Sequence, residues 1–284
     1  MKRHQANQCS NSGDYVNFNW QGIDPLNTFS NVFQQNFEIV KAVTPLLIDE
    51  AYRLRYQVYC EEKGYEDASR FPDQREYDAY DSHSVHCLVR HRFSGVYIGV
   101  ARLVLPHPRK TGQLLPIEQH CQLNLAETHP HFAALPRQSL GEASRFSVSR
   151  VFRRRVTEEG LIWGISRESD SFNADFYPGL NRRHLPMISL GLIGGLFQMC
   201  VDHGIDYCYA AMEPALLRLL KGFGLNFQPL GMPVEYHGMR VPAIFPVNEM
   251  HQVMRQRPEL RDILLAADRD SPQPQHYFKR AASL

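Results

Sequence analysis

Apolar residues in the first third of the chain recur with two different periods, and the switch between them marks the elements. Residues 37–43 (FEIVKAV) alternate with the two-residue period of a strand. Across residues 44–62 the apolar positions recur every three or four residues, the spacing of a helix, and a glycine follows as a stop signal. Residues 84–92 and 97–105 are strand-like and are joined by a short turn, so we expect a hairpin.

Strands and helices alternate again in the second half of the chain. A polar loop at 65–82 precedes the hairpin, and the stretch 106–136 is irregular, with one short helix expected near Ile117. The elements predicted beyond it are a strand at 139–148, a helix at 186–203, a strand at 205–212, a helix at 214–223, strands near Phe227 and at 241–245, and a helix at 258–267. This order predicts an α/β fold with a mixed central sheet flanked by helices.

Charge and composition favour a cytoplasmic protein without nucleic-acid binding, disulfides or a membrane span. The chain of 284 residues carries 31 basic and 30 acidic side chains, a net charge of +1, which does not favour nucleic-acid binding. Its six cysteines are scattered without a C-x-x-C pair, which is typical of reduced thiols in a cytoplasmic protein. The N-terminus lacks the apolar segment of a signal peptide, and the most apolar window, 187–201, is too short to span a bilayer.

The sequence shows no pattern typical of a cofactor or metal site. No G-x-G-x-x-G or P-loop pattern follows a predicted strand, so we expect no bound cofactor. His83 with His86, and His129 with His131, lack the spacing of a zinc site. We therefore expect these histidines to be surface residues, and the predicted set of metal ligands is empty.

The stretch REYDAYD at residues 75–81 concentrates negative charge just before the first hairpin strand. A solvated loop would explain it, and Asp81 could simply cap the entry to the strand. Glu76 and Asp78 are two residues apart, so in an extended segment both side chains point the same way. A carboxylate kept ionised beside an amine is a plausible base. Close carboxylates raise each other's proton affinity unless cations compensate, and the candidate cations are Arg55, Arg102 and Arg145.

Four segments of the chain share the order and spacing of motifs in a known family. They are LRYQVYCEEKGY (54–65), REYDAYD (75–81), YIGVARLVLP (97–106) and GEASRFSVSR (141–150). Together they resemble the acyl-homoserine-lactone (autoinducer) synthases, over roughly residues 37–247. Within that group the chain is most similar to the PEP-CTERM/exosortase system-associated acyltransferases, which resemble N-acyl amino acid synthases.

This resemblance implies a GNAT-like acyltransferase fold, with an N-terminal arm (1–35), an acyltransferase domain (36–250) and a C-terminal helical extension (251–284). It implies transfer of a fatty acyl group from a thioester of an acyl carrier protein, or of coenzyme A, to the amine of a small molecule such as an amino acid. Two alternatives stay open: an acyl-homoserine-lactone synthase that uses S-adenosylmethionine, and a non-catalytic protein that binds acyl lipids. The acyl product could also bring the protein into peripheral contact with a membrane.

The resemblance also implies site residues, and it makes Glu76, at the first acidic position of the family, the residue expected to hold or deprotonate the acceptor amine. The catalytic set is Glu76, Glu142 and Arg145, and the substrate-binding set is Arg55, Tyr59, Tyr65, Asp78, Asp81, Arg102, Ser144 and Phe146. The family usually has tryptophan where this chain has Tyr65, which favours a free amino acid over S-adenosylmethionine as acceptor. Arg55 is the nearest motif cation that could hold the carboxylate of such an acceptor.

The segment GEASRFSV makes a geometric prediction possible. In strict alternation Glu142, Ser144 and Phe146 share one face of the strand, and Arg145 takes the other. We predict that Arg145 reaches the acidic residues of 75–81. If Glu142 and Arg145 both reach one charged cluster, a β-bulge must interrupt the strand.

A basic strip follows that strand. No glycine-rich loop that could cradle the pyrophosphate of coenzyme A is evident after it. Acyl carrier proteins are acidic, so a basic strip would steer one toward the site, and a merely solvated face is the alternative. We therefore expect an acyl carrier protein as donor, docking on Arg150, Arg153, Arg154, Arg155, Arg218 and Lys221.

Overall fold

The computed structural model describes residues 25–110, 112–150 and 185–266, and their strands form one mixed sheet. The strand order is β1-β2-β3-β4-β5-β8-β6, and β7 pairs with β8. Among these residues β4 and β5 pair in parallel, and the other paired strands are antiparallel. The strands are β1 (Phe37–Lys41), β2 (Ser84–His91), β3 (Tyr97–Val104), β4 (Leu140–Val148), β5 (Tyr207–Met212), β6 (Gln228–Pro229), β7 (Val234–Glu235) and β8 (Met239–Pro246). The predicted α/β fold with a mixed sheet is confirmed.

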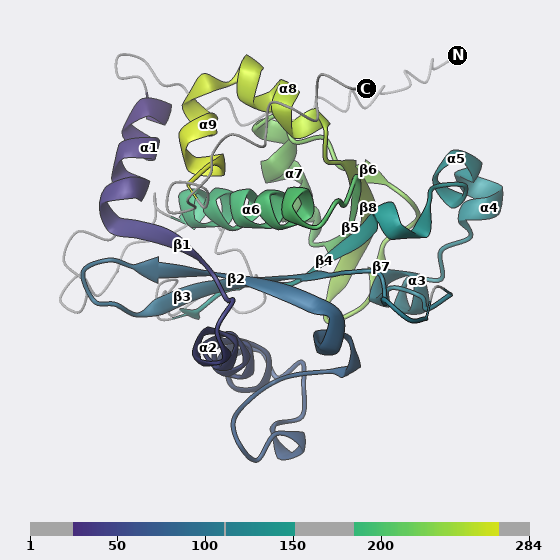
Figure 1. The fold of residues 1–284 in the computed structure, drawn as a ribbon, viewed down its shortest axis with the longest axis horizontal. Helices are drawn as coiled ribbons and strands as arrows, with labels where there is room; N and C mark the ends of the chain where they lie inside the picture. The colour runs from purple at the N-terminus through teal and green to yellow at the C-terminus, as the bar shows by residue number, and fades with distance from the viewer. Residues whose placement is uncertain (1–24, 111, 151–184, 267–284) are drawn as a thin grey trace, which may run out of the picture.

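Helices cover both faces of this sheet (Figure 1). α6 (Leu185–Asp202) crosses one face, and α1 (Pro25–Asn36) and α9 (Pro258–Leu264) pack against it. α2 (Pro45–Tyr56) lies on the opposite face against β2 and β3, and continues directly into a π-helix at Gln57–Glu62. The remaining helices are α3 (Pro116–His120), α4 (Leu125–Thr128), α5 (Pro130–Ala133), α7 (Pro214–Gly222) and α8 (Glu249–Gln256).

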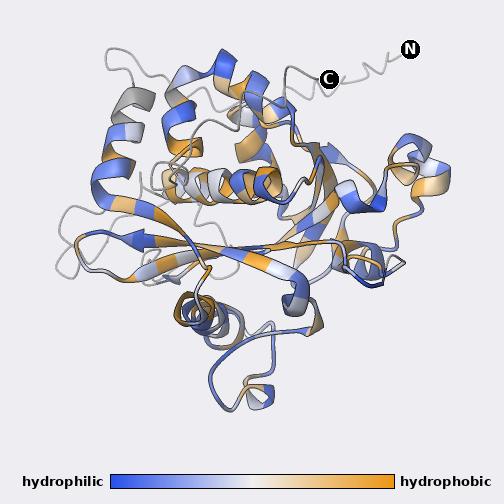
Figure 2. Ribbon diagram, viewed as in Figure 1, coloured by the Kyte–Doolittle hydropathy of each residue, from blue (hydrophilic) through white to orange (hydrophobic). Residues whose placement is uncertain are grey.

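The sequence of α6 explains why this helix lies in the core. Every residue from 187 to 200 is buried, and Figure 2 shows the helix as apolar along most of its length. A Cβ atom at Gly191 would overlap the ring of Phe33 on α1, and one at Gly194 would overlap the backbone of Leu264 on α9. Gly191 and Gly194 therefore allow α1 and α9 to approach α6 closely. Within the described ranges, no helix is long and apolar enough to cross a membrane.

Most predicted elements are confirmed, and four further helices form: α1, α8, and α4 and α5 within the stretch 106–136, where one short helix was expected. The first strand, the hairpin, the helices at 186–203 and 214–223 and the strand between them all form within a few residues of the predicted bounds. α1 forms where the sequence indicated an arm without periodicity, and α8 forms where the predicted tail had one helix, at α9. The sequence of α1 has weak helix propensity, because it contains three asparagines and β-branched threonine and valine. Burial of Phe33, which is 1% exposed, against α6 therefore stabilises α1.

Candidate active site

A separation of two neighbouring strands opens the sheet at the site. β4 and β5 are paired from Leu140–Tyr207 to Ala143–Ala210, and beyond that point the parallel pairing ends. On the other side of β4, the pair Arg102–Ser144 is followed by Val100–Ser147, so β4 carries one residue more than β3. Arg145 lies in this extra stretch with a φ of 49°. The predicted β-bulge is therefore confirmed.

The bulge directs Arg145 to the acidic stretch, as predicted. Its Nη2 atom lies 2.9 Å from Oε1 of Glu76 and 3.3 Å from Oδ2 of Asp78. Its guanidinium carbon lies 5.1 Å from the centre of the Tyr59 ring, a cation–π arrangement. The carboxylates of this segment therefore face a buried cation, and the solvated-loop alternative is excluded for Glu76, which is 1% exposed.

Arg55 and Arg102 complete a buried charged cluster with Arg145 and the carboxylates of residues 75–81. Arg55 is fully buried: its Nε donates to Glu76 at 2.6 Å, and its two terminal nitrogens donate to Asp81 at 2.6 and 2.9 Å. Arg102 donates to Asp78 at 2.7 Å and to the hydroxyl of Ser144 at 2.9 Å. With every nitrogen of Arg55 engaged inside the protein, this placement speaks against its predicted contact with the carboxylate of a substrate.

The two glutamates of the predicted catalytic set lie in opposite electrostatic environments. Burial alone would raise the pKa of Glu76, but the positive charges of Arg55 and Arg145 outweigh it and lower that pKa to about 2. Burial raises the pKa of Glu142 to about 8, against the hydrogen bond that its Oε2 accepts from the backbone N–H of Ile117 at 2.8 Å. Glu76 is therefore a firmly ionised carboxylate, whereas Glu142 can exchange a proton near neutral pH.

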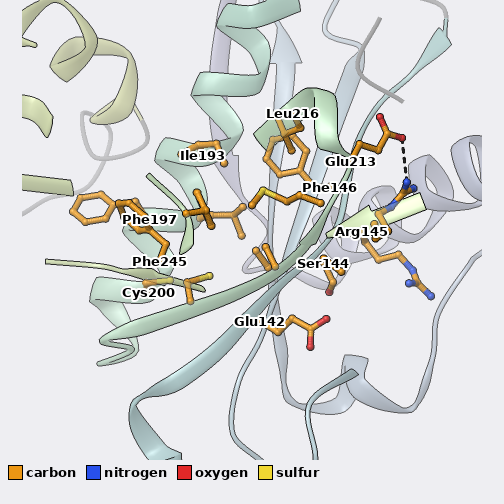
Figure 3. A pocket seen from close by; sticks show the side chains of 18 of the residues that line it. Glu142, Ser144, Arg145, Phe146, Ile193, Phe197, Cys200, Glu213, Leu216 and Phe245 are labelled. Atoms are coloured by element: carbon orange, nitrogen blue, oxygen red, sulfur yellow. Dashed lines mark ion pairs between the residues drawn. The ribbon is translucent and has the colours of Figure 1, made fainter. Parts of the chain in front are cut away.

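A cavity of about 100 Å3 lies between α6 and the separated strands. Figure 3 shows Ser144 and Arg145 on one side of it and Phe197 and Phe245 on the other. Glu142 and Tyr59 belong to the charged end. Apolar side chains line the rest, including Phe146, Ile193, Leu196, Phe197, Cys200, Ala210, Leu216 and Phe245. The cavity is therefore suited to a ligand with a long apolar part and a polar head.

Two residues of a tight turn close the charged end and have no counterpart in the sequence motifs. Tyr236 and His237 lie in the turn between β7 and β8, in which His237 and Gly238 have φ values of 52° and 89°. The His237 ring stacks on the Tyr65 ring with 5.5 Å between ring centres. This contact places the predicted substrate-binding residue Tyr65 at the site. Burial, and then the charges of Arg145 and Arg240, lower the pKa of His237 to about 4, so the ring is neutral at physiological pH.

The structure contradicts the predicted exposure of two histidines and describes only part of the basic strip. His86 is 3% exposed and lies 3.0 Å from Arg55 Nη1, and His83 is 9% exposed, so the expectation that both are surface residues was wrong. Their burial follows from packing beside the charged cluster, which local sequence does not reveal. No group of three potential metal ligands occurs in the described part of the chain. Arg218 and Lys221 are exposed on α7, whereas Arg153, Arg154 and Arg155 lie outside the described residues.

Residues 54–163 match the family described as an acetyltransferase (GNAT) domain. The fold is GNAT-like. This GNAT-like chain is 26% identical over 189 residues, 66% of its length and 66% of the relative's, to isovaleryl-homoserine lactone synthase of Bradyrhizobium diazoefficiens. It is 20% identical to the CoA-dependent acyl-homoserine lactone synthase BjaI solved with SAM and isopentyl-CoA, covering 82% and 98% of the two chains with a TM-score of 0.46. It is 15% identical to FeeM, an N-acyl amino acid synthase from uncultured soil microbes, covering 78% and 96% with a TM-score of 0.47.

Proposed function

We propose that this chain transfers a fatty acyl group from a thioester to the amine of a small molecule. The observation that carries the proposal is the cavity beside the separated strands, apolar along its length and charged at one end. Each CH2 group of an acyl chain buried there would contribute about 0.8 kcal/mol, and the thioester would then lie at the charged end. The match to a GNAT domain and the similarity to isovaleryl-homoserine lactone synthase support this class of reaction.

The reaction needs a base, and Glu142 fits that role better than Glu76. The acceptor nitrogen attacks the thioester carbonyl, the C–N bond forms, the C–S bond breaks, and the proton lost by the amine ends on the departing thiol. Glu142 lines the cavity, and its pKa of about 8 suits proton transfer near neutral pH. Glu76 has a pKa of about 2 and accepts hydrogen bonds from Arg55 and Arg145, so we assign it the positioning of Arg145.

The strand itself can supply donors for the transient oxyanion. Beyond Ala143, β4 is no longer paired with β5, so a ligand in the cavity can approach the backbone of β4 on that side. Donors fixed by a strand need no reorganisation during the reaction, which is what makes them effective.

We propose an acyl carrier protein as the donor, and Glu62 supports this choice. Its carboxylate accepts hydrogen bonds from the backbone N–H of Arg150 at 2.8 and 2.9 Å and from the hydroxyl of Ser149 at 3.0 Å. In GNAT enzymes that use coenzyme A, backbone N–H groups in the loop after the central strand meet the pyrophosphate. Here a carboxylate already accepts from the first of them and would repel a pyrophosphate.

For the acceptor we propose a free amino acid, because Tyr65 stacks on His237 where the family usually has tryptophan. The second candidate is homoserine lactone synthesis from S-adenosylmethionine, which the name of the curated relative suggests. Membership of the PEP-CTERM/exosortase-associated subgroup and a cytoplasmic location stay predictions from the sequence.

One experiment separates these functions. The purified chain is incubated with decanoyl-carrier protein or decanoyl-coenzyme A and with amino acids or S-adenosylmethionine, and products are identified by mass spectrometry. N-decanoyl amino acids are expected, decanoyl-homoserine lactone would establish the second candidate, and bound acyl chain without any product would indicate a non-catalytic acyl-binding protein.

The identity of the acyl donor is tested by reversing charges on the protein and by varying the ionic strength. Reversal at Arg153 and Arg154 should raise KM for the carrier-linked donor and leave kcat nearly intact, and kcat/KM should fall as ionic strength rises past about 0.15 M. Equal use of decanoyl-coenzyme A with no effect of the reversal would refute the carrier-docking role.

A further inference from the structure

Arg240 lies at the charged end of the cavity and belongs to none of the sequence motifs. It lies on β8, it lines the cavity, and it is 7% exposed. Its Nη1 atom donates to the backbone oxygen of Met239 at 3.1 Å and lies 3.4 Å from Oε1 of Glu213, the ion pair drawn as a dashed line in Figure 3. Within residues 25–110, 112–150 and 185–266, its Nε and Nη2 atoms donate no hydrogen bond.

The contrast with Arg55 shows what is unusual about Arg240. Arg55 is fully buried, and each of its three nitrogens donates to a carboxylate of Glu76 or Asp81. A guanidinium in a cavity wall whose donors have no partner in the protein can take its acceptor from a ligand. The planar pair of N–H groups formed by Nε and Nη2 matches the two oxygens of a carboxylate.

We propose that Arg240 binds the α-carboxylate of the acyl acceptor, which would make it the residue that selects amino acids over simple amines. This inference rests on the proposed transfer to an amine and names the chemistry of the acceptor. Glu213, the ion-pair partner of Arg240, lines the same cavity beside the proposed carboxylate site.

Other groups at this end support the assignment. Tyr59 and His237 line the same cavity, and the pKa of each is set first by burial, with the charge of Arg240 acting to lower it. Among the described residues Arg145 is the other arginine that lines it, and it already contacts Glu76, Asp78 and Glu66. Of these two arginines, Arg240 is therefore the one that can accept a new anionic partner without breaking the buried charged cluster around Glu76.

The test measures binding without turnover. Saturation-transfer NMR is recorded on the wild-type chain with a pool of the proteinogenic amino acids, and then with the pool of their carboxamides, which keep the amine and lose the carboxylate charge. Wild type should bind members of the acid pool at least about 10-fold more tightly than the matching carboxamides. Arg240→Gln should remove that preference, and Arg240→Lys should restore part of it. Arg255→Gln, at an exposed arginine of α8 that does not line the cavity, should leave it unchanged.

The outcomes separate this inference from the proposed function. An acid preference that survives Arg240→Gln, or a wild-type chain that binds neither pool, overturns the role of Arg240. Binding of amino acids that depends on Arg240, without any acylated product from a decanoyl thioester, supports the carboxylate site and refutes the acyl transfer. If Arg240→Gln does not fold, the double variant Arg240→Gln/Glu213→Gln removes both charges of the pair and carries the same test.

Discussion

Glu76 holds the buried cluster together, so its replacement by glutamine tests the reasoning about that cluster directly. Glu76 is 1% exposed and accepts hydrogen bonds from Nε of Arg55 at 2.6 Å and from Nη2 of Arg145 at 2.9 Å. Glutamine keeps the shape of the side chain, removes its negative charge and replaces one acceptor oxygen with an NH2 donor. Both guanidinium groups would then lose their shared counter-ion.

Two lines of reasoning give the size of the effect. The pKa of Glu76 falls from its ordinary value of 4.5 to about 2, and at about 1.36 kcal/mol per unit this favours the ionised folded state by about 3 kcal/mol. Removing one partner of a buried ion pair costs about 3–5 kcal/mol. We therefore expect Glu76→Gln to lower the free energy of unfolding by about 3 kcal/mol at neutral pH.

Urea unfolding at several pH values is the assay, with Glu61→Gln, at an exposed glutamate of the π-helix that follows α2, as the control. The pKa of Glu76 in the folded state lies below its ordinary value, so its stabilisation is complete above about pH 4.5 and is lost as the pH falls toward 2. The difference between wild type and variant should shrink over that window. An unchanged unfolding midpoint at neutral pH, or a difference that does not depend on pH, would refute the reasoning.

Three further predictions concern the base, the core and the acyl chain. Wild-type kcat/KM should rise with pH up to about 8, and Glu142→Gln should lose about 10²-fold in rate together with that inflection, so an unchanged profile would exclude Glu142 as the base. Gly194→Ala should lower the free energy of unfolding by about 1–3 kcal/mol because a Cβ there overlaps the backbone of Leu264. In Gly222→Ala, where a Cβ meets nothing within 4 Å, thermal unfolding should be nearly unchanged, and equal stability of the two variants would contradict the close packing. Ala210→Leu should shift products from mixed donors toward shorter acyl chains, as read by mass spectrometry, whereas the same chain-length distribution would show that the acyl group lies elsewhere.

Local signals in the sequence account for the elements that support the site. Hydrophobic periodicity predicts the hairpin β2–β3 and the helix α6, because a two-residue or 3.6-residue period directly reflects which face is buried. The bulge in β4 could also be predicted, since a contact between Arg145 and the acidic stretch is incompatible with strict alternation beside Ser144. The sequence therefore contains the frame of the site and one of its irregularities.

The residues that close the charged end could not be predicted in the same way. Arg240 lies on β8, which pairs with β5, and His237 lies in the turn between β7 and β8. The motifs come from earlier parts of the chain and do not indicate either strand pairing. Gly238 is a local sign of a turn, but it does not indicate which cavity the turn covers. His86 was misjudged for the same reason, because Arg55 and Asp81, which bury it, come from other elements.

The bulge in β4 connects the charged cluster with the cavity. A left-handed φ of 49° at Arg145 is unfavourable by about 1–2 kcal/mol for a residue with a side chain. The ion pair with Glu76, in a cluster whose disruption costs about 3–5 kcal/mol, is large enough to offset that strain. The same extra residue reverses the alternation beyond it, so Phe146 packs with the cluster around α6 and not on the face of Ser144, whose hydroxyl accepts from Arg102. A regular strand would avoid the strain, but it would leave Glu76 with Arg55 alone and would take Phe146 out of the cavity wall. One inserted residue therefore both completes the buried cluster and shapes the space in which the acyl chain is proposed to bind.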